Sequence, residues 1–172
     1  MANFIHYGGI PEYNKQLNIS EKQADLFAQS VLKTIVEKDI FQRLNITNKH
    51  DFNKIIDFVF DSVGSYVSPR SISDTLRSNG TIIDKQTVAK YLDALCEAYL
   101  IYKVPRFEIK GKGLLQTLNK YYVVDPCFAK VRLKKAILKD RSHWLENMVY
   151  LELLRQNKEV FIGKRHNLEV DF

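Results

Sequence analysis

One stretch of the chain changes its periodicity from that of a helix to that of a strand: DKQTVAKYLDALCEAYLIYKVPRF, residues 84–107. It begins with Asp84, a favourable helix N-cap, and continues with apolar residues three and four positions apart. Those apolar positions are Val88, Tyr91, Leu92, Leu95 and Tyr99. From Leu100 to Phe107 apolar and polar residues alternate loosely, and β-branched and aromatic residues are frequent. The stretch therefore predicts a helix followed directly by a strand.

Two further helices are predicted on the amino-terminal side of this stretch. The first has Asp51 as its cap and ends near Gly64. Its apolar face is formed by Phe52, Ile55, Ile56, Val59, Phe60 and Val63. A second, short helix follows Ser68, and Asn79-Gly80 marks a turn before the third helix. Two helices joined by a short turn are typical of a helix-turn-helix unit.

A β-hairpin is predicted on the carboxyl side. Gly111 and Gly113 flank Lys112 in a loop, and residues 121–124 form a second strand that Asp125 and Pro126 close. Three helices followed by a two-stranded hairpin have the order of a winged helix-turn-helix domain. We therefore predict such a domain over residues 51–126.

The flanking segments complete the predicted organisation. Residues 1–50 are expected to be an N-terminal helical segment, in which Ser20 and Gln23 form a capping box and a helix runs to about Leu44. The elements predicted for residues 127–172 are a basic helix at 130–139, a helix at 144–156, and strands at 159–163 and 169–172. The predicted fold class is therefore α+β and mostly helical.

The C-terminal segment, with a helix followed by two strands, resembles the first half of a PD-(D/E)XK nuclease core. Such nucleases gather carboxylates around Mg²⁺, which prefers oxygen ligands. By this resemblance Glu146 is the helical acid, Asp171 is the strand acid, and Glu169 points to the same face as Asp171. The alternative interpretations are a carboxylate favoured by the helix dipole for Glu146 and an exposed strand residue for Asp171. Because the chain stops at Phe172, we expect a truncated segment, a longer parent protein, and no cleavage by this fragment.

The composition of the chain is that of a folded domain. Of 172 residues, 45% are hydrophobic and 27% are charged, which excludes a wholly disordered chain. No apolar run approaches the roughly 18 residues needed to cross a bilayer, and the N-terminus has no signal-peptide pattern. Cys96 and Cys127 form no CxxC motif. We therefore expect a cytoplasmic protein with no membrane partner.

The positive charge is concentrated in one segment. The whole chain carries a net charge of +6, whereas residues 101–141 contain 11 basic and 3 acidic residues and so carry +8. A locally basic segment favours an acidic partner such as nucleic acid. The alternative is a solvated face that maintains solubility.

Seven short motifs follow one another along the chain. They are YGGIPE (7–12), LKTIVEKDI (32–40), KQTVAKYL (85–92), LI (100–101), KYYVVDP (120–126), LENMV (145–149) and EVDF (169–172). Together they resemble the C-terminal region of bacterial and archaeal AAA-type ATP-binding proteins, in which a domain of unknown function follows the ATPase core. The resemblance implies a parent protein that binds ATP and Mg²⁺ through a core upstream of Met1. This chain has no Gly-x-x-x-x-Gly-Lys-Ser/Thr loop, so no cofactor and no catalytic residue are expected in it.

A winged helix binds double-stranded DNA by placing its third helix in the major groove and its wing on the phosphate backbone. The candidate DNA-binding residues are Arg70, Ser71, Lys85, Gln86, Thr87, Lys90, Lys110, Lys112 and Lys120. Asp93 and Glu97 lie on the same third helix and would repel phosphate. Because winged helices also bind proteins, a protein-interaction or oligomerisation adaptor is the alternative function.

Overall fold

The structure is a computed structural model, and it describes residues 8–10, 20–108, 113–134, 141–165 and 168–170. The fold is α+β and mostly helical, as predicted. The helices are α3 (Glu21–Thr34), the π-helix η1 (Ile35–Gln42), α4 (Lys49–Asp61), α5 (Pro69–Ser78), α6 (Lys85–Glu97), α7 (Pro126–Leu133) and α8 (Arg141–Arg155). The strands are β1 (Tyr66–Val67), β2 (Ile101–Glu108), β3 (Gly113–Val123), β4 (Ile162–Arg165) and β5 (Leu168–Val170).

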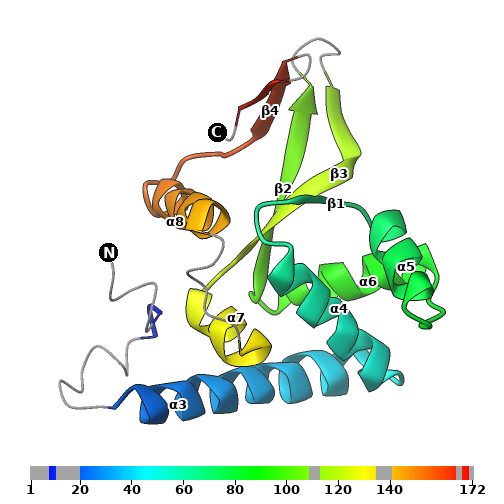
Figure 1. Cartoon of the computed structure of the whole chain (residues 1–172), viewed down its shortest axis with the longest axis vertical. Helices are drawn as coiled ribbons and strands as arrows, with labels where there is room; N and C mark the ends of the chain where they lie inside the picture. Colours follow the sequence, from blue (N-terminus) through cyan, green and yellow to red (C-terminus); the bar gives the residue numbers. More distant parts are fainter. Residues whose placement is uncertain (1–7, 11–19, 109–112, 135–140, 166–167, 171–172) are drawn as a thin grey trace.

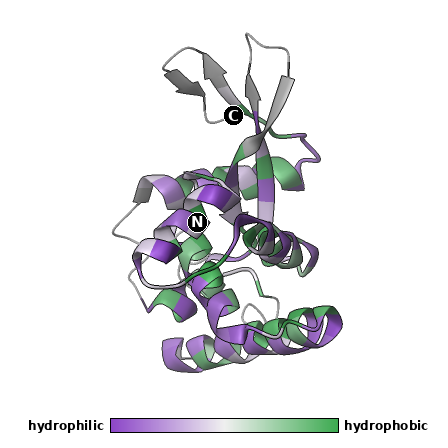
Figure 2. Ribbon diagram, turned by 90° about the vertical axis from the view of Figure 1, so that its right-hand side faces the viewer, coloured by the Kyte–Doolittle hydropathy of each residue, from purple (hydrophilic) through white to green (hydrophobic). Residues whose placement is uncertain are grey.

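The first helix lies along one side of the molecule (Figure 1). The predicted capping box is confirmed, because the Ser20 hydroxyl accepts from the Gln23 backbone and the Gln23 side chain accepts from the Ser20 backbone. Hydrophobic and hydrophilic residues alternate along α3 (Figure 2). The buried residues recur every four positions from Ala24 through Ala28 and Leu32 to Val36 and Ile40. The helix continues to Gln42 in π-helical form, a register change that apolar periodicity does not reveal.

Helices α4, α5 and α6 form a cluster on one side of the sheet (Figure 1). The predicted apolar face of α4 is confirmed, since Phe52, Ile55, Ile56, Val59 and Phe60 are all buried. The predicted cap of α4 was wrong. Asn48 is the N-cap, and its side-chain oxygen accepts from the backbone N–H of the expected cap residue, Asp51. The prediction of Asp84 as the cap of α6 is confirmed.

One five-stranded sheet contains both predicted strand pairs, in the order β1-β3-β2-β4-β5. Strands β2 and β3 are antiparallel, and their register shifts between Pro105 and Arg106. A proline cannot donate a ladder hydrogen bond, and the shift is of the kind found at β-bulges. Strand β3 begins at Gly113, well before the predicted start at Tyr121. Strand β4 pairs parallel with β2, so the sheet continues across the predicted boundary at residue 126.

Both C-terminal helices begin three or four residues earlier than predicted, and α8 otherwise matches the helix predicted at 144–156. The basic helix predicted at 130–139 begins at Pro126 and ends at Leu133, where Lys134 adopts a left-handed conformation with φ of 51°. Residues 135–140 lie outside the described residues. Helix α7 packs against α3 and α4, and α8 packs against β3, so one hydrophobic core joins all of these elements. Among the described residues, no helix is long and apolar enough to cross a membrane.

Candidate nucleic-acid interface

A short turn, in which Thr81 and Ile83 are buried, joins helices α5 and α6. Residues 79–84 connect them, and Gly80 has a φ of +81° that a residue with a side chain rarely adopts. The Ser73 hydroxyl, buried on α5, donates a 2.6 Å hydrogen bond to the Ile83 carbonyl. Ile72 and Val88, both fully buried, anchor the two helices in the core. The turn therefore orients α6 rigidly relative to α5.

The outer face of α6 presents the predicted polar residues to solvent. Lys85, Gln86 and Lys90 are exposed. Thr87 is half-buried, and its hydroxyl donates a 2.6 Å hydrogen bond to Asp84. That hydroxyl and the Thr87 backbone N–H hold the pKa of the Asp84 carboxyl below its usual value. Thr87 thus reinforces the helix cap, and the other three side chains are available to a partner.

The two acidic residues that would repel phosphate are each close to a cation. Asp93 lies 3.8 Å from the Lys103 ammonium, and Glu97 lies 3.2 Å from the Arg43 guanidinium. Both pairs are exposed, so each contributes little to stability. Arg43 and Lys103, neither of which belongs to α6, nevertheless reduce the negative charge at the carboxyl end of this helix.

The start of α5 offers one exposed cation. Arg70 is exposed, and its guanidinium lies 3.7 Å from Asp74 one turn further on. Ser71 is committed to a capping box with Ser68, in which each side chain accepts from the other residue's backbone N–H. The Ser71 hydroxyl also donates to the Ser68 carbonyl at 2.9 Å. A phosphate group would therefore have to compete with Ser68 for the Ser71 hydroxyl.

Lys120 is not on the surface of a wing. Because β3 begins at Gly113, Lys120 lies in the middle of that strand, and only 3% of its side chain is exposed. Its ammonium lies 2.7 Å from Glu146 of α8 and 5.3 Å from the centre of the Tyr66 ring. We therefore exclude Lys120 from the candidate interface. Lys110 and Lys112 lie outside the described residues.

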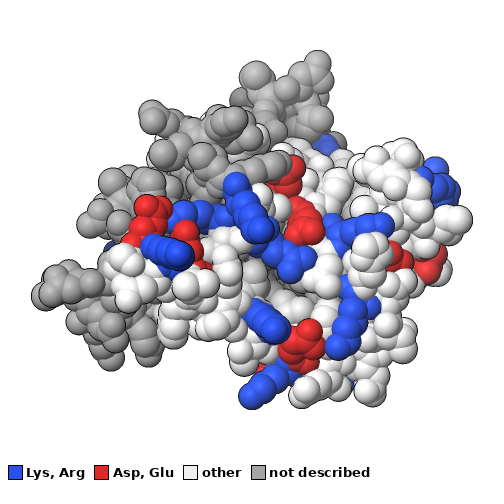
Figure 3. Space-filling view, turned by 60° about the horizontal axis from the view of Figure 1, so that its bottom comes forward, with Lys and Arg blue, Asp and Glu red and all other residues white. Residues whose placement is uncertain are grey.

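Four of the eleven cations of the +8 segment, Lys103, Lys120, Lys130 and Arg132, pair with carboxylates of described residues of the same chain. Lys130 lies 2.8 Å from Glu21 and 3.0 Å from Asp25, and Arg132 lies 2.6 Å from Asp57. Basic and acidic side chains are likewise interspersed on the α3 side of the molecule (Figure 3). Lys130 and Arg132 of this segment therefore join α7 to α3 and α4.

Glu146 lies in a buried polar cluster between α8 and the sheet. Its Oε1 atom accepts a 2.5 Å hydrogen bond from the Tyr122 hydroxyl in addition to the Lys120 contact, and its Oε2 atom lies 3.9 Å from His143. The next residue, Asn147, is fully buried and pairs with both the N–H and the carbonyl of Val123. Sequence patterns do not reveal this cluster, because Glu146 and Lys120 are 26 positions apart.

The predicted metal site is not assembled by the described residues. Glu169 pairs with Lys164 through the backbone of β5, whereas its side chain and all of Asp171 lie outside the described residues. Among the described residues, no group of three His, Cys, Asp or Glu side chains could hold a metal ion. The Glu146 carboxylate is bound by an ammonium and a phenol hydroxyl, which does not fit a ligand open to hydrated Mg²⁺. We derive no metal chemistry from it.

Two features of the interface were not predicted. Arg77 is exposed near the end of α5, and Ile82 in the connecting turn is 86% exposed. The signal for Ile82 was present in the sequence, where it stands directly before Ile83 and only one of the two can face the core. Both residues are exposed between the middle of α5 and the start of α6 in the chain.

By its fold, the chain is a mostly helical α+β protein with a mixed sheet. A family model described as a domain of unknown function, DUF8612, matches residues 1–137, and the chain belongs to that family. It is 35% identical over 171 residues to an uncharacterized protein of Haemophilus influenzae, covering 99% of this chain and 42% of that protein. It is 29% identical over 176 residues to an uncharacterized protein of Methanocaldococcus jannaschii, covering 100% and 38%. The chain thus spans about two fifths of the length of these relatives. No solved structure matches it.

Proposed function

We propose that residues 49–123 act as a winged helix-turn-helix module that binds double-stranded DNA. The main observation in support is that α6 has one buried apolar face and one exposed polar face. Val88, Leu92 and Leu95 are buried, whereas Gln86 and Lys90 are exposed on the opposite side and Lys85 is exposed at the start of the helix. A helix of this kind fits the major groove when its exposed face carries groups that donate to bases and phosphates.

The order of elements supports the same function. Helix α4, strand β1, helices α5 and α6, and the hairpin of β2 and β3 follow one another, and β1 pairs with β3. The hairpin extends away from the helices (Figure 1), where a wing would reach the DNA backbone. In this proposal Arg70 and Arg77 contact phosphate from α5, and Gln86 reads base edges.

Charge around α6 favours an anionic partner. Among the described residues, Lys85, Lys90 and Arg77 have no carboxylate within 4.0 Å of their charged groups. Their charges are therefore available to phosphate, and binding of DNA would release condensed counterions.

The experiment is fluorescence anisotropy with a labelled random-sequence duplex at two salt concentrations. The test variant is Lys85→Ala with Lys90→Ala, and the matched control is Lys22→Ala with Lys38→Ala, two exposed lysines of the α3–η1 helix. Binding that neutralises phosphates weakens as salt rises, so the logarithm of the association constant falls with the logarithm of the salt concentration. We expect this fall to be less steep by about two in the test variant, since each lost phosphate contact removes about one. Absence of binding by the unmodified protein at low salt, or equal slopes for the two variants, would contradict the proposal.

We further propose that this module belongs to an AAA-type ATP-binding protein, in which it relays the state of a bound partner to the ATPase core. The proposal rests on the seven motifs that resemble such proteins. The relatives are more than twice as long as the aligned region, so they have room for another domain. Sequencing the genomic reading frame around this chain tests it, and a frame without a phosphate-binding loop would contradict it.

A protein-interaction adaptor is the second candidate function, and the outer face of α8 favours it. Leu145 and Val149 are about half exposed there, next to Met148 and Leu153, around a hollow of about 550 Å³. An exposed apolar patch of this kind is typical of a contact surface. Light scattering after size exclusion tests self-association. A monomer at high concentration, together with salt-dependent DNA binding, would favour the first function.

A further inference from the structure

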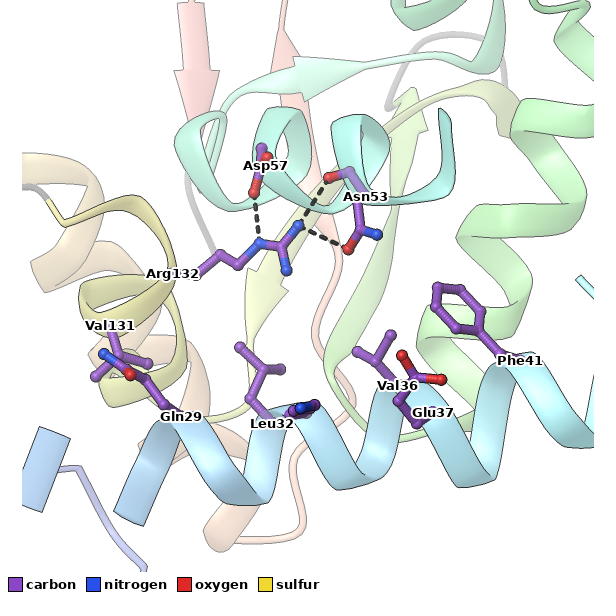
Figure 4. A pocket seen from close by; sticks show the side chains of 10 residues that line it. Gln29, Leu32, Val36, Glu37, Phe41, Asn53, Asp57, Val131 and Arg132 are labelled. Atoms are coloured by element: carbon purple, nitrogen blue, oxygen red, sulfur yellow. Dashed lines mark hydrogen bonds and ion pairs between the residues drawn. The ribbon is translucent and has the colours of Figure 1, made fainter. Parts of the chain in front are cut away.

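A second concave site lies on the other side of α4, away from α6. A cavity of about 410 Å³ opens between α3–η1, α4 and α7 (Figure 4). Leu32, Val36, Phe41 and Val131 form its apolar wall. The volume is within the range of small-molecule sites in proteins, which are mostly apolar with a few placed polar groups.

Arg132 supplies the placed polar group. Its Nε atom donates a 2.6 Å hydrogen bond to Asp57 Oδ1, and its Nη2 atom donates to the Asn53 carbonyl and side-chain oxygen at 3.2 and 2.8 Å. These three bonds fix the plane of the guanidinium. The remaining nitrogen, Nη1, points across the cavity toward α3 (Figure 4) and has no hydrogen-bond partner among the described residues.

The cavity wall carries Lys33 and Arg132 against Glu37 and Asp57, and Lys49, which pairs with Glu37 from outside the wall, leaves one positive charge in excess. Asp57 is neutralised by Arg132, and Glu37 is neutralised by Lys49 at 3.2 Å. Lys33, which is exposed on the same wall, has no carboxylate within 4.0 Å among the described residues. An oxyanion between Arg132 and Lys33 would therefore meet two donors without displacing an existing ion pair.

The π-helix is an independent indication of a ligand site. Val36, Glu37 and Phe41 all belong to η1, and they form one end of the cavity wall. A π-helical segment is less favourable than a continuous α-helix and occurs frequently at functional sites. The π-helix lies beside the cavity that contains Arg132, and this position supports a binding site there.

We propose that this cavity binds a small organic anion with an apolar body. The oxyanion head contacts Arg132 Nη1 and the Lys33 ammonium. The apolar body covers Leu32, Val36 and Phe41. The site is separate from the proposed DNA-binding face, so either proposal can fail without the other.

The probe is 1-anilinonaphthalene-8-sulfonate, which combines an anionic head with an aromatic body and fluoresces when its surroundings are apolar. We expect Lys33→Met to raise its Kd about two- to five-fold, the effect of losing one exposed ion pair. Arg132→Met should raise it about ten-fold or more, because a charge-assisted hydrogen bond is lost. Gln29→Trp, on the exposed rim of the cavity, should reduce binding by filling it.

Lys38→Met is the matched control, since Lys38 is exposed on η1 but does not line the cavity. Thermal unfolding checks the fold of each variant. If Arg132→Met does not fold, Lys33→Met and Gln29→Trp still decide the question. No binding by the unmodified protein, or equal binding by Lys33→Met, Gln29→Trp and Lys38→Met, would overturn the proposal.

Competition against the probe identifies the head group. Octanoate and octyl phosphate carry a carboxylate and a phosphate on the same apolar chain, whereas octanol carries no charge. We expect one or both anions to displace the probe, and the tighter one defines the natural head group. Displacement by octanol as effective as by either anion would overturn the proposal, because it would show an apolar site without charge recognition.

Discussion

The backbone N–H of Gly9 donates a 2.7 Å hydrogen bond to the Asp125 carboxylate, 116 positions further along the chain. The same carboxylate accepts from Cys127 N–H at 3.0 Å and caps α7. Two motifs that the sequence places at opposite ends of the DUF8612 match, YGGIPE and KYYVVDP, therefore meet at one carboxyl group. The positive φ of Gly8 and the close approach of Asp125 explain why a glycine stands at position 8.

Gly8→Ala is expected to destabilise the fold more than the same change at Gly80. Gly8 has a φ of +73°, and a Cβ atom there would lie 2.1 Å from Asp125 Oδ1. Gly80 has a φ of +81° but nothing within 4 Å of its Cβ position, so it is the matched control. Positive φ costs each variant about 1–3 kcal/mol, and only Gly8→Ala adds the clash. Urea unfolding measures both, and equal losses would show that the contact with Asp125 contributes nothing.

Asp125 is expected to make stability depend on pH. Burial raises the pKa of the Asp125 carboxyl, although the hydrogen bonds from Cys127 and Gly9 oppose that shift. A carboxyl group with a raised folded-state pKa contributes stability that is complete below its unfolded value and lost as pH rises through its folded value. Asp125→Asn should therefore gain stability relative to the unmodified protein between pH 3 and pH 7.

Asparagine at position 125 still caps α7 but loses one acceptor, so a constant offset between the two proteins is expected as well. The titration of Asp125 is therefore seen only in how the difference in unfolding free energy between the two proteins changes with pH. Urea unfolding at both pH values measures it. A difference that is the same at pH 3 and pH 7 would contradict the raised pKa.

Breaking the pair of Lys120 and Glu146 is expected to be costly. Their side chains are 3% and 11% exposed, so removing one partner leaves a buried charge. Lys120→Met or Glu146→Leu should each cost about 3–5 kcal/mol of unfolding free energy, and the double variant should recover much of it. Arg155 and Glu152 have the same 2.7 Å separation on the surface and are the control pair. Urea unfolding measures the losses, and equally small losses of unfolding free energy for the buried and the exposed pair would contradict the expectation.

The two thiols are expected to react slowly in the folded protein. Burial raises the pKa of Cys96 to about 11, and burial also raises the pKa of Cys127. The thiolate is the reactive form, so a disulfide reagent at pH 7.5 should modify both residues far faster in urea than in buffer. Rapid reaction of either thiol in buffer would show that its surroundings are more open than in the structure.

Much of the fold follows from local sequence. The stripe from Phe52 to Phe60 and the cap at Asp84 were predicted correctly, because a helix depends on neighbours three and four positions away. The start of β3 was not predicted, because residues 113–120 become a strand by pairing with β1 and β2 rather than by an alternating pattern of their own.

The candidate site was predictable only where exposure follows from helix periodicity. Gln86 and Lys90 are exposed because the opposite face of α6 is apolar, and Lys85 is exposed at the first position of the helix. Lys120 was expected at a wing tip, but its strand lies between β1 and β2 and its ammonium meets Glu146 of α8. The contribution of a charged side chain thus depended on which distant element packs against it.

The sequence by itself determined where most helices lie, the caps Ser20 and Asp84, and the two-faced character of α6, since these depend on short-range hydrogen bonds and on the period of apolar residues. Only the tertiary structure decided that Gly9 meets Asp125, that Lys120 is buried against Glu146, and that Arg132 faces a cavity. The physical reason is that burial and charge pairing depend on contacts between residues far apart in the chain. Such contacts exist only after the hydrophobic core has brought the elements together.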